Sequence, residues 1–151
     1  MKLIFVAAAL SCSPLAIAED KAAYPTENVA QFVVEKLDVT SLPSAFRPKK
    51  EKAKKTFAEY GFTAKKLDEN DAIIEAADGV NRLAIKALDH TSKGIYVCFA
   101  ELGQNGGEAK TQGAFLLKRK DSNALLKGHE SFREFAACPV IGGSDSTADS
   151  C

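Results

Sequence analysis

The stretch YVCFAELGQNGGEAKTQGAFLLKRK, residues 96–120, decides the fold class. Two runs of strand-forming residues flank GQNGG at 103–107, which holds three glycines in five residues. A phosphate-binding loop would need a lysine directly after the glycines and then a helix. Here the following segment alternates as a strand does. The sequence therefore predicts a β-hairpin whose connection is GQNGG.

The period of two continues on the N-terminal side of this hairpin, and connections rich in turn residues separate the runs. Short connections between consecutive strands favour an antiparallel sheet. The sequence therefore predicts a five-stranded antiparallel meander. Its expected strands lie near 62–67, 72–77, 80–88, 94–102 and 108–119.

Helical patterns precede the predicted sheet. Residues 26–38 predict a first helix, with Thr26 as its N-cap. The apolar stripe of this helix is Val29, Phe32, Val33 and Leu37. A second helix is expected from Arg47-Pro48 to Gly61, with proline in its first turn. Its thin apolar stripe is Ala53, Phe57 and Tyr60.

A third helical pattern follows the sheet. Ser131-Phe132-Arg133-Glu134 has the form of a capping box and predicts a short C-terminal helix. The predicted fold is thus a single α+β domain: two N-terminal helices, a five-stranded antiparallel meander and a short C-terminal helix.

The first eighteen residues, MKLIFVAAALSCSPLAIA, have the three parts of a secretory signal: Lys2, an apolar core and the cleavage site Ala16-Ile17-Ala18. This core is too short for a membrane span, which takes about 20 residues. Lipidation at Cys12 is an alternative, but the residues before Cys12 fit a lipidation site only loosely. We therefore expect a cleaved signal peptide at 1–18, one domain at 19–140 and a flexible tail at 141–151, in the periplasm or secreted.

Three cysteines remain after that cleavage, an odd number for an oxidising compartment. A Cys98–Cys138 disulfide is the first choice, because Cys98 lies in an apolar strand and Cys138 closes an amphipathic segment that could dock on the sheet. Cys138–Cys151 is the main rival, since the small polar tail could bring the last residue back. A free Cys151 would be exposed and could join two chains as a homodimer.

The chain has 20 basic and 20 acidic side chains, so overall charge gives no reason to expect nucleic acid or an anionic membrane as a partner. Residues 47–55, however, hold six positive charges and only one negative. This run is either a solvated helix face or a docking surface for an acidic protein, an anionic envelope polymer or lipid head groups. The candidate partner contacts are Lys49, Lys50 and Lys52, together with Gln104 and Asn105 in the hairpin loop.

Residue types for catalysis are few. The two histidines are 39 positions apart and lie in no metal-binding spacing, so we expect neither a metal nor a cofactor. Asp89-His90-Thr91-Ser92 contains the residue types of a triad, but neighbours in a tight turn point in different directions. A hydrolase that uses Asp89, His90 or His129 is one alternative, and it requires both histidines near one polar pocket.

The leading hypothesis is an exported, non-enzymatic domain that binds another protein. Such a domain would act as a periplasmic inhibitor or immunity-type protein and sterically block an envelope-acting enzyme. A projecting polar loop on a rigid sheet supports this hypothesis. A further alternative is an envelope scaffold or a carrier of small apolar ligands, in which the sheet would curve around an apolar cavity.

Overall fold

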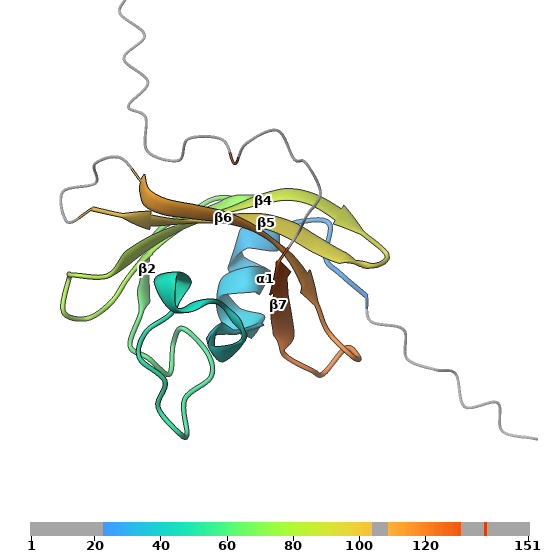
Figure 1. The fold of residues 1–151 in the computed structure, drawn as a ribbon. Coiled ribbons are helices and arrows are strands. Elements are labelled where there is room, and N and C mark those ends of the chain that lie inside the picture. Colours follow the sequence, from blue (N-terminus) through green and yellow to red (C-terminus); the bar gives the residue numbers. More distant parts are fainter. Residues whose placement is uncertain (1–22, 104–108, 131–137, 139–151) are drawn as a thin grey trace, which may run out of the picture.

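A seven-stranded sheet forms most of the protein (Figure 1). The computed structural model describes residues 23–103, 109–130 and 138. Strands β2 to β7 form an antiparallel meander in chain order, and the two-residue strand β1 pairs in parallel with β7 at one edge. The strands are β1 Leu37–Asp38, β2 Thr63–Leu67, β3 Asp71–Glu75, β4 Arg82–Thr91, β5 Gly94–Leu102, β6 Ala109–Lys118 and β7 Leu126–Glu130.

The predicted fold class is wrong in its helices and in its strand count. The described chain has one α-helix, two short 3-10 turns and six antiparallel strands, so it is mostly sheet. Strands β2 to β6 do fall where the alternating pattern predicts strands. The 3-10 turns are η1 (Val39–Ser41) and η2 (Ser44–Phe46).

The single helix, α1, spans Val29–Lys36 and is shorter than the sequence predicts. Its N-cap is Asn28, in the left-handed conformation with φ 51°, and not Thr26. No side chain caps this helix. Instead, the N–H of Ala30 donates to the carbonyl oxygen of Glu69, 3.1 Å away in the β2–β3 turn. The helix therefore begins where the sheet can satisfy its first turn, a tertiary contact that local sequence does not show.

The second predicted helix is absent, because residues 47–62 form turns. Only one helix-like turn forms there: the N–H of Tyr60 donates to the carbonyl of Thr56, and Gly61 ends the turn at φ 80°. Thr56 and Glu59 form a capping box at the start of this turn: the Thr56 N–H donates to the Glu59 carboxylate, and the Glu59 N–H faces the Thr56 hydroxyl. Gly61 follows so soon that only one turn fits between the capping box and the glycine. Upstream, lysines three and four residues apart would repel one another on a helix.

Strand β7 is the sixth antiparallel strand and is not predicted from the sequence. Its sequence LKGHE holds a single apolar residue, Leu126, which is fully buried. One apolar side chain gives no visible period of two, so pairing with β6 determines this strand. The predicted C-terminal helix at 131–134 lies outside the described residues.

The sheet curves over α1, and residues 39–62 lie on the same side, so the concave face carries the main core (Figure 1). Val29 and Val33 of α1 meet inward-facing residues such as Phe99 of β5, and all three are at most 1% exposed. Phe46 of η2 packs edge-on against Phe115, with ring centroids 5.4 Å apart. The turn-rich segment thus contributes aromatic anchors in place of a second helix.

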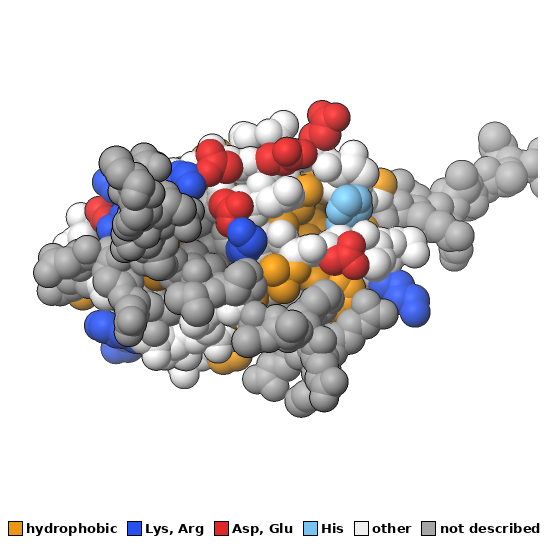
Figure 2. Space-filling model, turned by 90° about the horizontal axis from the view of Figure 1, so that it is seen from above, with side chains coloured by type: hydrophobic (Ala, Val, Ile, Leu, Met, Phe, Trp, Pro, Cys, Tyr) orange, Lys and Arg blue, Asp and Glu red, His pale blue; other side chains and the backbone are white. Residues whose placement is uncertain are grey.

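The opposite face of the sheet is buried along β5 as well. Tyr96, Cys98 and Ala100 point away from α1, yet each is at most 6% exposed. Figure 2 looks down on this face, where acidic and hydrophobic side chains are interspersed. Burial on both sides explains why β5 reads as a nearly continuous apolar run.

Candidate functional site

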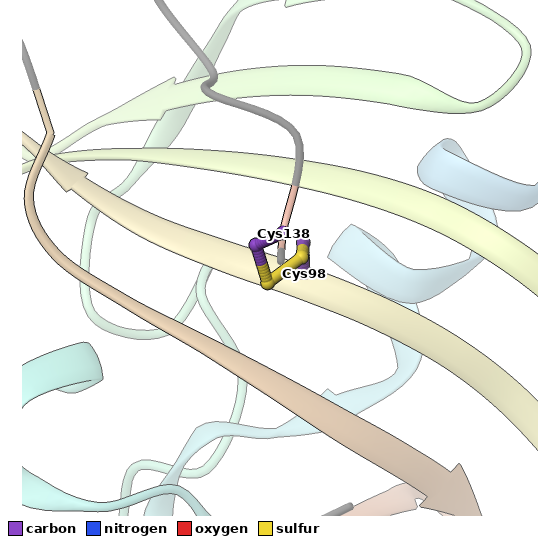
Figure 3. Close-up of a disulfide and its surroundings, with 2 residues drawn as sticks. All are labelled: Cys98 and Cys138. Atoms are coloured by element: carbon purple, nitrogen blue, oxygen red, sulfur yellow. A yellow bond between two sulfur atoms is a disulfide. The ribbon is translucent and has the colours of Figure 1, made fainter. Parts of the chain in front are cut away.

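A disulfide joins Cys98 of β5 to Cys138 on the face of the sheet opposite α1 (Figure 3). The two Cα atoms are 5.7 Å apart, and the cysteines are 40 positions apart in sequence. This is the first of the two pairings predicted from the sequence. It fastens the chain beyond β7 to the centre of the sheet.

A cluster of lysines at the β1–β7 edge is the most distinctive chemical feature of the described surface. Two shallow hollows lie side by side there and share Lys55. One hollow is lined by lysines of the 50–55 segment beside Thr40, and the other by lysines of β6, β7 and the turn between them beside Asp38. We call this cluster the basic surface; it comprises Lys50, Lys52, Lys54, Lys55, Lys118, Lys120 and Lys127.

Hydrogen bonds hold the backbone at Lys55, where the two hollows meet. Its carbonyl accepts from the N–H of Val39 at 2.8 Å, and its own N–H donates to the Glu59 carboxylate at 2.7 Å. The N–H of Thr56 donates to the same carboxylate oxygen at 2.8 Å. Backbone hydrogen bonds, from Thr56 first and then Lys55, lower the pKa of Glu59. Nearby, Phe57 is fully buried and anchors the segment in the core.

Arg119 holds the other half of the basic surface in place. Its guanidinium lies over the rings of Tyr24 and Phe32, 5.7 and 5.1 Å from their centroids. It also donates to the carbonyl oxygens of Ser122 and Ala23. Arg119 therefore links the β6–β7 turn to α1 and to the segment before it, and is not a free surface cation.

The basic surface differs from the lysines of strands β2 and β4 in how its charges are paired. Six of its seven lysines are exposed, and none of the six forms an ion pair with the side chains that the structure describes. The exception, Lys54, binds Glu51 at 2.9 Å. In contrast, Lys65, Lys66 and Lys86 on strands β2 and β4 each pair with a carboxylate.

The neutral overall charge hides this segregation. Segments 47–55 and 118–127 together hold ten of the 20 basic side chains but only two of the 20 acidic ones. A strong positive field must therefore surround this edge of the sheet even though the whole chain is neutral.

The structure brings together some of the predicted partner contacts and separates others. Lys50 and Lys52 line the first hollow, whereas Lys49 is exposed and lines neither hollow. Gln104 and Asn105 lie outside the described residues. The loop that carries them connects β5 and β6 after Leu102, and Lys118 marks the other end of β6. Lys118, Lys120 and Lys127 are not among the partner contacts predicted from the sequence, although the run Lys118-Arg119-Lys120 is a visible signal.

The two histidines do not share a pocket. His90 of β4 pairs with Ile95 of β5, Ile95 pairs with Leu117 of β6, and Leu117 pairs with Gly128 of β7. Three strand spacings, or about 14 Å, therefore separate His90 from β7. His129 follows Gly128 and so points to the opposite face of the sheet. Both histidines are exposed. The geometry required by the hydrolase alternative is therefore not present.

The concave side of the sheet is filled, contrary to the expectation of the carrier alternative. Within the described chain, α1 and the aromatic side chains of residues 39–62 occupy the space beneath the curve. Val33, Phe57 and Phe99 are fully buried there. A small hollow near Leu83 lies at the end of the sheet on this side.

Comparisons with family models, with curated proteins and with solved structures find no match to this chain. Among the described residues, no helix has the length and apolarity that a membrane crossing requires. The same residues contain no group of three or more His, Cys, Asp or Glu side chains placed to hold a metal ion.

Proposed function

We propose that this chain is an exported, non-enzymatic protein that binds an acidic partner protein through the basic surface. In this role it acts as a periplasmic inhibitor or immunity-type protein and sterically blocks an envelope-acting enzyme. The observation that carries the proposal is the meeting of two lysine-rich segments, far apart in sequence, around Lys55.

The arrangement suits recognition of a protein for two physical reasons. Exposed, unpaired lysines attract an acidic surface over a distance and speed the encounter. The backbone beneath them is already held by the Glu59 and Arg119 contacts, so binding orders side chains but does not have to order loops. Electrostatic attraction of this kind weakens as salt rises.

A paired set of variants tests the proposal. The triple variant Lys55→Gln, Lys120→Gln and Lys127→Gln removes three charges from the basic surface. The control Lys65→Gln, Lys66→Gln and Lys110→Gln removes three exposed charges from β2 and from the end of β6 far from Lys118. The mature chain from Glu19, with each set of changes, is used to capture proteins from periplasmic fractions, and the affinity of each purified partner is then measured at two salt concentrations.

We expect one stoichiometric acidic partner that the control retains. The surface triple variant should bind that partner at least about tenfold more weakly, and wild-type affinity should fall with salt. Equal binding by both triple variants would remove the basic surface as the contact. The double variant Gln104→Ala, Asn105→Ala examines the hairpin loop in the same assay, and loss of affinity there without a change in Tm would move the contact to that loop.

A further inference from the structure

A hollow of about 170 Å³ lies between η2, the start of β2 and the adjoining ends of β4 and β5. Phe46, Phe62 and Leu83 form its apolar floor, and each is between 5% and 9% exposed. An engineered protein cavity of about 150 Å³ accepts benzene, so this hollow can hold one ring or one branched aliphatic group. It is too small for an extended lipid chain or a peptide.

The rim of this hollow carries opposite charges. Arg47 and Glu101 line it, and no ion pair joins them in the described structure. Arg82 also borders the hollow, but it pairs with Leu102 in the strand ladder, so its side chain lies on the opposite face of the sheet beside Glu75. Cation and anion are therefore both available to a ligand, and neither neutralises the other. A ligand that carried only one charge would face one attractive and one repulsive group.

The guanidinium of Arg47 is already oriented at the rim. Its Nε donates to the carbonyl oxygen of Leu42 at 2.9 Å, and its Nη1 lies 3.5 Å from the carbonyl oxygen of Pro48. Further N–H groups of this guanidinium remain for a ligand. A carboxylate is the acceptor that matches them best.

We propose that this hollow binds a small zwitterion with an apolar side chain, of the α-amino acid type. The ligand carboxylate would bind Arg47, its ammonium group would bind Glu101, and its side chain would rest on Phe46, Phe62 and Leu83. This inference goes beyond the proposed function. Ile95 of β5 pairs with Leu117, next to Lys118 of the basic surface, and Glu101 lies six residues further along the same strand. The hollow is therefore about 20 Å from the basic surface.

Three matched probes test which charges matter. The mature protein is titrated with L-phenylalanine, with 3-phenylpropionate, which lacks the ammonium group, and with phenethylamine, which lacks the carboxylate. Binding is followed by changes in backbone amide NMR shifts. We expect saturable shifts that centre on Phe62, Leu83 and Glu101 for L-phenylalanine, and at least about tenfold weaker binding of each single-charge probe, the effect of losing one charge-assisted hydrogen bond.

The variant Glu101→Gln separates a binding role from a structural one. It should abolish the preference for L-phenylalanine over 3-phenylpropionate while binding of 3-phenylpropionate stays equal or becomes stronger. The control Glu69→Gln, an exposed carboxylate in the β2–β3 turn, should keep the wild-type preference. Equal binding of all three probes, shifts centred elsewhere, or no saturable shift with L-phenylalanine would overturn the proposal. None of these results bears on the lysine variants, so the proposed function would stand or fall separately.

Discussion

Glu59 shows at the scale of one residue how a short motif can override a longer helical pattern. Its carboxylate accepts hydrogen bonds from the N–H groups of Lys55 and Thr56, and its N–H faces the Thr56 hydroxyl at 3.4 Å. The motif Thr56-x-x-Glu59 can be read directly from the sequence. It marks a helix start so close to Gly61 that the helix predicted from residue 47 cannot form upstream of it.

These hydrogen bonds predict a pH dependence. The folded-state pKa of Glu59 is lowered, so its contribution to the free energy of unfolding is fully present above the unfolded-state pKa. That contribution is lost as pH falls through the lowered folded-state value. Glu59→Gln does not titrate, so the difference in stability between wild type and variant should shrink as the solution becomes acidic.

Urea unfolding at a series of pH values measures this difference. The control Glu27→Gln changes an exposed carboxylate before α1 and should show no such convergence. A difference between wild type and Glu59→Gln that stays constant through the acid range would contradict the assigned hydrogen bonds.

The predictability of each element follows its burial pattern. Strands β3 to β6 alternate clearly or run apolar, and their places can be predicted from sequence alone. Strand β7 has one buried apolar side chain, and β1 has two residues, so neither carries a pattern of its own. Both strands form because they pair with a neighbouring strand, and the sequence of the strand itself does not show that this neighbour is there.

The β4–β5 hairpin offers a test at the scale of an element. A Cβ added at Gly94 would clash with the carbonyl oxygen of Leu117 on β6 and would lie 2.8 Å from a Leu116 methyl carbon. This carbonyl belongs to the backbone of β6, which the hydrogen bonds between β5 and β6 hold in place, so it cannot move aside easily. Gly94→Ala should therefore lower the free energy of unfolding by about 2 kcal/mol or more, as overpacked sites do.

Chemical denaturation measures this loss. Ser92→Ala, in the exposed turn of the same hairpin, serves as the control and should stay within about 0.5 kcal/mol of wild type. Wild-type stability in Gly94→Ala would mean that β5 and β6 do not approach each other as closely as the structure shows.

At the scale of the whole molecule, the candidate site is partly visible in the sequence and partly not. Lys50 and Lys52 can be chosen from composition alone, because they lie in a dense basic run. The contribution of Lys118, Lys120 and Lys127 depends on β7 pairing with β6 and on β1 pairing with β7. No local pattern places residue 55 beside residue 120, so the basic surface emerges only with the topology.

The Cys98–Cys138 disulfide acts on the whole chain, because it closes a loop between residues 40 positions apart. In the chain-entropy model a loop of this size stabilises the folded state by about 4 kcal/mol. Cys138→Ala keeps the buried Cys98 side chain and removes only the link, so it should lose about that much stability. Cys151→Ala should lose none, and alkylation of the native wild type should label neither Cys98 nor Cys138.

The rival Cys138–Cys151 pairing gives the opposite pattern, which makes the experiment decisive. In that case Cys151→Ala would abolish a disulfide and Cys98 would be a free thiol after unfolding. Guanidinium unfolding with and without reductant, followed by mass analysis of alkylated peptides, separates the two pairings. A stability that reductant leaves unchanged would contradict both pairings as a stabilising cross-link.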